Sequence, residues 1–300
     1  MKKLISLIAV LSIAITSYSQ TLKPYILGAT SNGNIDEIKV QVKSGLESVG
    51  FTVVGEYMPV EDSSRWVMII SHQALDNAVK TVGSLTGFAS TLRLAITKEE
   101  NIVNISYTNP TYWGNAYFRD DFDKVASDYT KVESAFKQAV ANIGEAKGTA
   151  FGSEEGEEIK DLRKYHYMFA MPYFDETKDF GDFETHEEVI DKIEYSLKWG
   201  KPGVKMVYRH DVPGTQLTLY GFALSGETGE GNFMPKIDLA SPKHTAFLPY
   251  ELLVDDNEVH MLHGRFRIAL SFPDLTMGTF TKIMSTPRDI EDLLKQLVED

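Results

Sequence analysis

The stretch Thr91–Trp113, TLRLAITKEENIVNISYTNPTYW, decides the fold of this chain. From Leu92–Ile96 apolar residues alternate with polar ones, a pattern typical of a β-strand. The polar run Lys98–Asn101 predicts a turn, and Ile102–Tyr107 predicts a second strand that returns beside the first. Together these segments form a predicted β-hairpin.

A second copy of this plan lies near the C-terminus. The stretch Phe247–His263, FLPYELLVDDNEVHMLH, contains an apolar extended run, an acidic turn at Asp255–Glu258 and a further extended run from Val259. The chain is therefore predicted to contain two related hairpins.

A helix precedes each hairpin at a matching position. Asn34 with Glu37 predicts one helix start, and Thr185 with Glu188, 151 residues further on, predicts the other. The spacing grows to about 158 residues after a glycine- and glutamate-rich insertion at Gly226–Gly231, which we interpret as a surface loop. Weak identity at a constant spacing indicates a duplicated unit, so the chain is predicted to be a tandem of two repeats.

The predicted boundaries are a secretory signal at 1–19, a first repeat at 20–145, a linker at 146–160 and a second repeat at 161–300. The signal consists of two lysines, an apolar run of roughly 12 residues and small residues before Gln20. That run is too short to span a bilayer, which needs about 20 residues. We therefore expect a periplasmic or secreted protein with no transmembrane segment in its mature chain.

Composition narrows the possible partners. The chain has 43 acidic and 30 basic residues, a formal net charge of −13, and loss of the two signal lysines makes it −15. Such a charge disfavours nucleic acid and an anionic membrane surface as partners, because both are bound through basic residues. The absence of cysteine excludes disulfides, thiol catalysis and cysteine-ligated metals.

Short segments of both copies share the pattern of one known family: Val49–Val53, Trp66–Ile70, Leu92–Ile96 and Ser106–Pro110 in the first, and Tyr220–Gly221, Leu248–Pro249 and Asp255–Glu258 in the second. The chain resembles domain-of-unknown-function family 302. This resemblance implies an α+β fold in which each repeat is a helix-flanked antiparallel sheet. Because similar single domains associate in pairs, it also implies an intramolecular pseudo-dimer. The family has no established activity, so the resemblance assigns no catalytic residues.

Three aromatic residues of the first copy, Tyr107, Tyr112 and Trp113, are candidate ligand-binding residues. The dipeptide Asn109–Pro110 breaks the strand between them, so we expect the rings to gather at one end of the sheet. An apolar ligand or a partner would dock there, and packing within the core is the alternative.

The corresponding segment of the second copy carries the candidate residues His263, Arg265 and Arg267. They form a local positive patch on an acidic chain, which suits an anionic ligand or a carboxylate from the other copy. Buried or interdomain salt bridges are the alternative.

We therefore expect an exported binding protein of the cell envelope that holds a small molecule or an envelope protein between its copies. It would be a monomer with an internal pseudo-dimer, or a homodimer. One alternative is an envelope enzyme, a hydrolase or a haem- or metal-assisted protein, that uses His210, His260 or His263. Another is a purely structural envelope protein. The sequence predicts neither a cofactor nor a metal site, since His260 and His263 would point to opposite faces of one strand.

Overall fold

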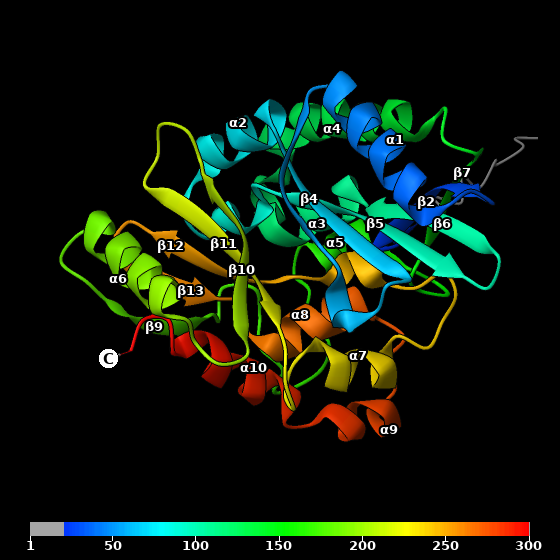
Figure 1. Ribbon diagram of the computed structural model, residues 1–300. Coiled ribbons are helices and arrows are strands. Elements are labelled where there is room, and N and C mark those ends of the chain that lie inside the picture. The colour runs from blue at the N-terminus through cyan, green and yellow to red at the C-terminus, as the bar shows by residue number, and fades with distance from the viewer. Residues whose placement is uncertain (1–20, 300) are drawn as a thin grey trace, which may run out of the picture.

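The computed structural model describes residues 21–299, so the predicted secretory signal at 1–19 lies outside the described residues. The fold is mixed α+β, with two large antiparallel sheets flanked by helices (Figure 1). The first sheet has the spatial order β3 (Phe51–Tyr57), β4 (Arg65–His72), β5 (Leu92–Glu99), β6 (Ile102–Thr108), β2 (Tyr25–Ser31) and β7 (Glu145–Phe151). The second has the order β10 (Val204–Asp211), β11 (Leu217–Leu224), β12 (Tyr250–Asp255), β13 (Glu258–Met261) and β9 (Lys178–Asp182).

Both predicted hairpins are confirmed. Strands β5 and β6 pair as far as Glu99 with Ile102, and β12 and β13 pair as far as Asp255 with Glu258, so each hairpin has a two-residue turn. The first turn residue, Glu100 or Asp256, has φ of 55° in both, which is the left-handed conformation that such short hairpin turns require.

The two sheets have the same strand order apart from β7, which adds only to the first. Helices flank both sheets. The first unit contains α1 (Ile35–Ser48), α2 (Gln73–Val82), α3 (Pro110–Phe118) and α4 (Phe122–Val140), and the second contains α6 (His186–Trp199), α7 (Glu230–Ile237), α8 (Gly264–Ser271), α9 (Met277–Phe280) and α10 (Thr286–Lys295). Figure 1 shows α1, α2 and α4 gathered in one layer, and α7 to α10 gathered on the other side of the molecule.

The predicted linker at 146–160 is largely extended chain. It contains most of β7, which pairs with β2 and exposes six of its seven residues. Strand β8 (Glu157–Glu158) then pairs with β1 (Thr21–Leu22), and the short helix α5 (Ile159–Leu162) follows. As its glycines and acidic residues suggest, this segment contributes little to the core.

Buried polar side chains join the two units. The Arg93 guanidinium of β5 forms a buried ion pair with the Glu251 carboxylate of β12. The Tyr112 hydroxyl of α3 donates a hydrogen bond of 2.8 Å to the Leu270 carbonyl oxygen of α8. Each of these pairs joins residues 158 positions apart, which equals the spacing predicted from the sequence for this part of the chain.

Other contacts between the units are reciprocal. The 3-10 turn η2 (Ser84–Ala89) of the first unit packs on β12, and the 3-10 turn η4 (Thr245–Phe247) of the second packs on β5. Strands β3 and β10 also approach closely, since a Cβ added to Gly55 would lie 2.6 Å from the Val207 carbonyl oxygen. One apolar cluster contains residues of both units, and a second cluster lies within the second unit.

Glu230, at the start of α7, links the units through a buried carboxylate. Its Oε1 accepts from the Tyr57 hydroxyl at 3.0 Å, and its Oε2 accepts from the Val60 backbone N–H at 3.1 Å. Burial raises the pKa of this carboxyl to about 7. The sequence assigned Glu230 to a loop, and the prediction is wrong at this residue because α7 begins there and carries it into the contact.

Within residues 21–299, none of the helices combines the length and the apolar character that crossing a bilayer requires.

Replacing Glu251 by Gln should lower the free energy of unfolding by about 3–5 kcal/mol, because two buried arginines, Arg93 and Arg267, lose their counter-charge. Urea denaturation measures this loss. The control is Glu258→Gln, at a half-exposed carboxylate of the same hairpin, which should cost less than about 0.5 kcal/mol. Equal losses in the two variants would contradict the role of the pair.

The stability of the protein should also depend on Glu230 in a predictable direction. Its folded-state pKa lies above the unfolded value, so its contribution is complete below about pH 4.5 and is lost as the pH rises through about 7. The free energy of unfolding should fall by about 3 kcal/mol over that range from this group. Glu230→Gln should remove this pH dependence, whereas the exposed neighbour Glu227→Gln should retain it. A Glu230→Gln variant with the wild-type pH profile would refute the assignment.

Candidate functional site

A large cleft lies where the two units meet. It encloses about 1070 Å³ of empty space, including open solvent. Its walls come from Lys23 and residues 150–154 at the end of β7, from the segment 237–244 that begins at the end of α7, and from the segment 272–279 that runs from α8 into α9. A cavity of this size between two structural units is a common place for a ligand.

The wall at 237–244 belongs to the second unit and is held by carboxylate contacts to the first. The Arg65 guanidinium of β4 pairs with Asp238 at 2.5 Å, and the second oxygen of Asp238 accepts from the His244 backbone N–H at 2.8 Å. Glu99 of β5 accepts hydrogen bonds from the Ser241 hydroxyl at 2.6 Å and from the Lys243 backbone N–H at 3.0 Å. These bonds fix the loop, and with it the position of His244.

His244 is the buried polar residue of the cleft. Its side chain lies among three aromatic rings, with centroid distances of 5.1 Å to Tyr25, 4.8 Å to Phe272 and 5.8 Å to Phe151. The residue is only 7% exposed, and its Nδ1 atom has no hydrogen-bond partner. Burial lowers the pKa of the imidazole, so the neutral form predominates at neutral pH.

The opposite wall is polar, and hydrogen bonds join its residues to one another. Asp274 accepts a hydrogen bond of 3.1 Å from the Ser153 hydroxyl and one of 2.8 Å from the Glu154 backbone N–H. Lys23 donates from Nζ to the Glu154 carbonyl oxygen at 3.0 Å. The cleft therefore combines an aromatic floor that contains one imidazole with a rim of charged and hydroxyl groups.

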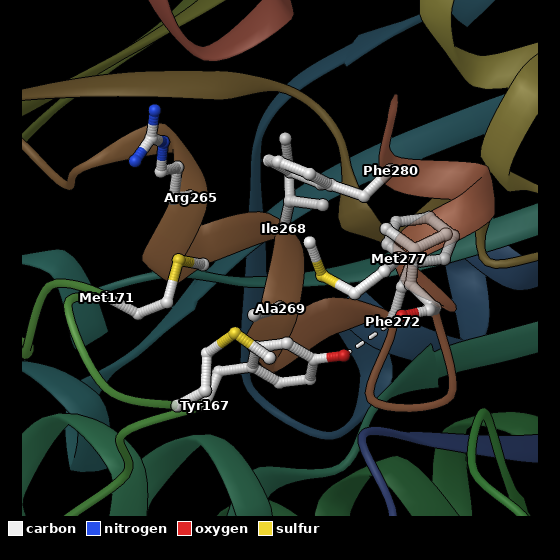
Figure 2. Close-up of a pocket in the computed structure, with 10 residues that line it drawn as sticks. Tyr167, Met171, Arg265, Ile268, Ala269, Phe272, Met277 and Phe280 are labelled. Carbon is white, nitrogen blue, oxygen red and sulfur yellow. Dashed lines mark hydrogen bonds between the residues drawn. The ribbon is translucent and has the colours of Figure 1, made fainter. Parts of the chain in front are cut away.

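An apolar pocket lies on the other side of Phe272 and Leu275, which line both cavities. It holds about 380 Å³ of empty space, part of it open to solvent. Figure 2 shows Tyr167, Met171 and Met277 around it, with the Tyr167 hydroxyl bonded at 3.1 Å to the Leu275 carbonyl oxygen. Arg265 stands at its edge on α8.

The predicted aromatic residues lie in the core that joins the units. Tyr107 stacks on Phe136 at 4.3 Å, Tyr112 bonds to α8 as described, and the Trp113 indole N–H donates to the Pro24 carbonyl oxygen at 2.9 Å. All three are at most 4% exposed, and none of them lines the cleft or the apolar pocket. Tyr107 lies on β6, whereas Tyr112 and Trp113 lie on α3, and all three side chains belong to the same apolar cluster.

The predicted basic residues are separated by the helix that carries them. His263 caps α8, with its Nδ1 accepting from the Arg265 backbone N–H at 3.1 Å, and burial lowers the pKa of this imidazole. Arg265 is exposed at the apolar pocket. Arg267 is buried, donates from Nη2 to the Phe247 carbonyl oxygen at 2.8 Å and lies 3.8 Å from Glu251. The six predicted site residues therefore do not form one site.

The other candidate histidines also lie apart. His210 on β10 bonds through Nε2 to Asp76 of α2 at 2.8 Å, and His260 on β13 bonds to Thr177 at 3.2 Å and Glu258 at 3.0 Å. Across the part of the chain that the structure describes, no three His, Cys, Asp or Glu side chains are grouped to hold a metal ion.

Sequence reasoning missed His244. It is a single histidine in a loop, and the rings around it come from positions distant in the chain. No local pattern marks it, so only the packing of the two units reveals it.

No protein-family model matches this chain, and no curated protein matches it. One solved structure, an uncharacterized conserved protein DUF302 from Bacillus stearothermophilus, is similar over 38% of this chain and 96% of its own. The sequence identity is 16% and the TM-score is 0.33, a level at which the likeness carries no argument about function.

His244→Phe tests whether the buried imidazole lowers the free energy of unfolding. The substitution keeps an aromatic ring and removes an unpartnered buried nitrogen, so the free energy of unfolding at neutral pH should rise by about 1 kcal/mol. The pKa of His244 is depressed, so its contribution is present above about pH 6.5 and is lost as the pH falls through the lower folded value. The variant should lose less stability than wild type on acidification. Denaturation at several pH values measures both effects, and a destabilised variant with the wild-type pH profile would contradict the assignment.

Proposed function

We propose that the chain is an exported binding protein whose two tandem repeats pack as an intramolecular pseudo-dimer, with a small molecule held in the cleft between them. The shared strand order and the contacts of Arg93 with Glu251 and of Tyr112 with Leu270 support the pseudo-dimer. The lysine-containing apolar N-terminus supports export to the periplasm or the exterior.

The observation that carries the proposal is the buried imidazole of His244 in the cleft, whose Nδ1 atom has no hydrogen-bond partner. A buried polar atom without a partner costs free energy, and a ligand that supplies the missing hydrogen bond removes that cost. A titratable group with a perturbed pKa in a large cleft is also a general sign of a functional site.

The cleft defines the chemical class of the ligand. A neutral imidazole offers one N–H donor and one nitrogen acceptor, and the rings of Tyr25, Phe151 and Phe272 surround it with apolar surface. The rim adds the hydroxyls of Thr276 and Thr279. These features suit a small molecule with an apolar face and a hydroxyl or carboxyl group. A segment of an envelope protein that presents the same groups is the alternative occupant.

Native mass spectrometry of protein purified from its own cell envelope tests the proposal. Wild type should carry a mass excess that disappears on denaturation, and His244→Phe should lose most of it because the ligand loses its polar contact. The control is His186→Phe, at the start of α6 on the second sheet and away from the cleft, which should retain the excess. Equal retention by His244→Phe and wild type would contradict binding at the cleft.

A further inference from the structure

The apolar pocket beside α8 is suited to a hydrocarbon chain. Its lining includes three methionines, Met168, Met171 and Met277, together with Ile268 and Phe280. Methionine side chains are flexible and polarizable, so they adapt to flexible apolar ligands. The empty space of about 380 Å³ includes open solvent, so a ligand chain would lie against these side chains along a partly open surface.

The rim of this pocket is unusually apolar for a protein surface. Met168 is 41% exposed, Met277 is 52% exposed and Phe169, beside Met168 in the chain, is 95% exposed. Exposed apolar side chains grouped around a cavity indicate a surface that is covered in use.

Arg265 supplies an unpaired positive charge at the same edge. It is exposed and forms no ion pair with any residue in the described range 21–299. The neighbouring charges are engaged elsewhere, since Lys178 pairs with Glu291 at 3.1 Å and Glu176 accepts from the Tyr173 backbone N–H at 2.8 Å. On a chain with a net charge of −13, this cation distinguishes the pocket from its surroundings.

We propose that this pocket is a second binding site that takes the hydrocarbon chain of an anionic amphiphile, such as a fatty acid, with its acidic head group paired to Arg265. The apolar walls account for the chain, and the unpaired arginine at the edge accounts for the charge of the head group. The site goes beyond the proposed function, because its ligand contacts α8 and the methionines and does not require His244.

Isothermal titration calorimetry with octanoate, decanoate and dodecanoate, below the concentrations at which they form micelles, tests the apolar part. Each methylene buried in the pocket should tighten binding by about fourfold until the pocket is full. Dodecanol should bind as well, with lower affinity, since it has the same chain and no charge. No detectable binding of dodecanoate, or no dependence on chain length, would overturn the proposal.

Arg265→Gln tests the charge. It should weaken dodecanoate binding by about twofold to fivefold, as expected for an exposed ion pair, and leave dodecanol binding unchanged. Arg288→Gln, at an arginine of α10 whose side chain is 84% exposed, is the matched control and should change neither. Equal effects of Arg265→Gln on the acid and the alcohol would overturn the assignment of Arg265.

Two substitutions locate the chain in the pocket. Ala269→Phe fills the space from α8 and should abolish binding of both probes, with circular dichroism used to verify folding. Met277→Glu places a negative charge at an exposed rim position, so it should weaken dodecanoate more than dodecanol even if Ala269→Phe does not fold. Met284→Glu, at a methionine that is 60% exposed and outside the pocket lining, should have no effect. Dodecanoate binding that is unchanged in Met277→Glu would place the ligand elsewhere.

Discussion

The ion pair between Arg93 and Glu251 is the interaction on which the arrangement of the two units depends. Both groups are almost completely buried, and burial of an ion is favourable only when an opposite charge and further hydrogen bonds compensate its lost hydration. Glu251 receives this compensation from Arg93, Arg267 and the Tyr208 hydroxyl.

The contact between β5 and β12 also positions the wall of the cleft. Once β5 and β12 are joined, Arg65 and Glu99 of the first sheet reach the loop that carries His244 and hold it against Tyr25 and Phe272. Carboxylate hydrogen bonds fix this loop, so the imidazole stays in an apolar environment. The other contacts between the units offset the free-energy cost of burying it there. Local destabilisation of this kind is expected where a ligand binds.

The two cavities share a wall but differ in chemistry. Phe272 and Leu275 line both, yet the cleft has one buried imidazole and a polar rim, while the pocket has methionines and an arginine at its edge. Of the predicted site residues, only Arg265 lines either of these two cavities. Tyr107, Tyr112 and Trp113 were recognisable as an aromatic cluster, but a cluster of rings has the same sequence pattern in a core as in a binding site.

The sequence by itself determined the hairpins, the helix that precedes each of them and the constant spacing of the two copies, because these depend on local alternation, capping and turn residues. It also marked Arg265 and Arg267 as a local positive patch, without separating their roles. Only the tertiary structure decided which polar residues are buried. The alternation in β5 is that of a strand with one face in water, yet Arg93 and Thr97 on that face are buried. The burial of His244 has the same cause. The surfaces that cover His244 and the polar face of β5 come from distant parts of the chain, and local sequence periodicity carries no information about those surfaces.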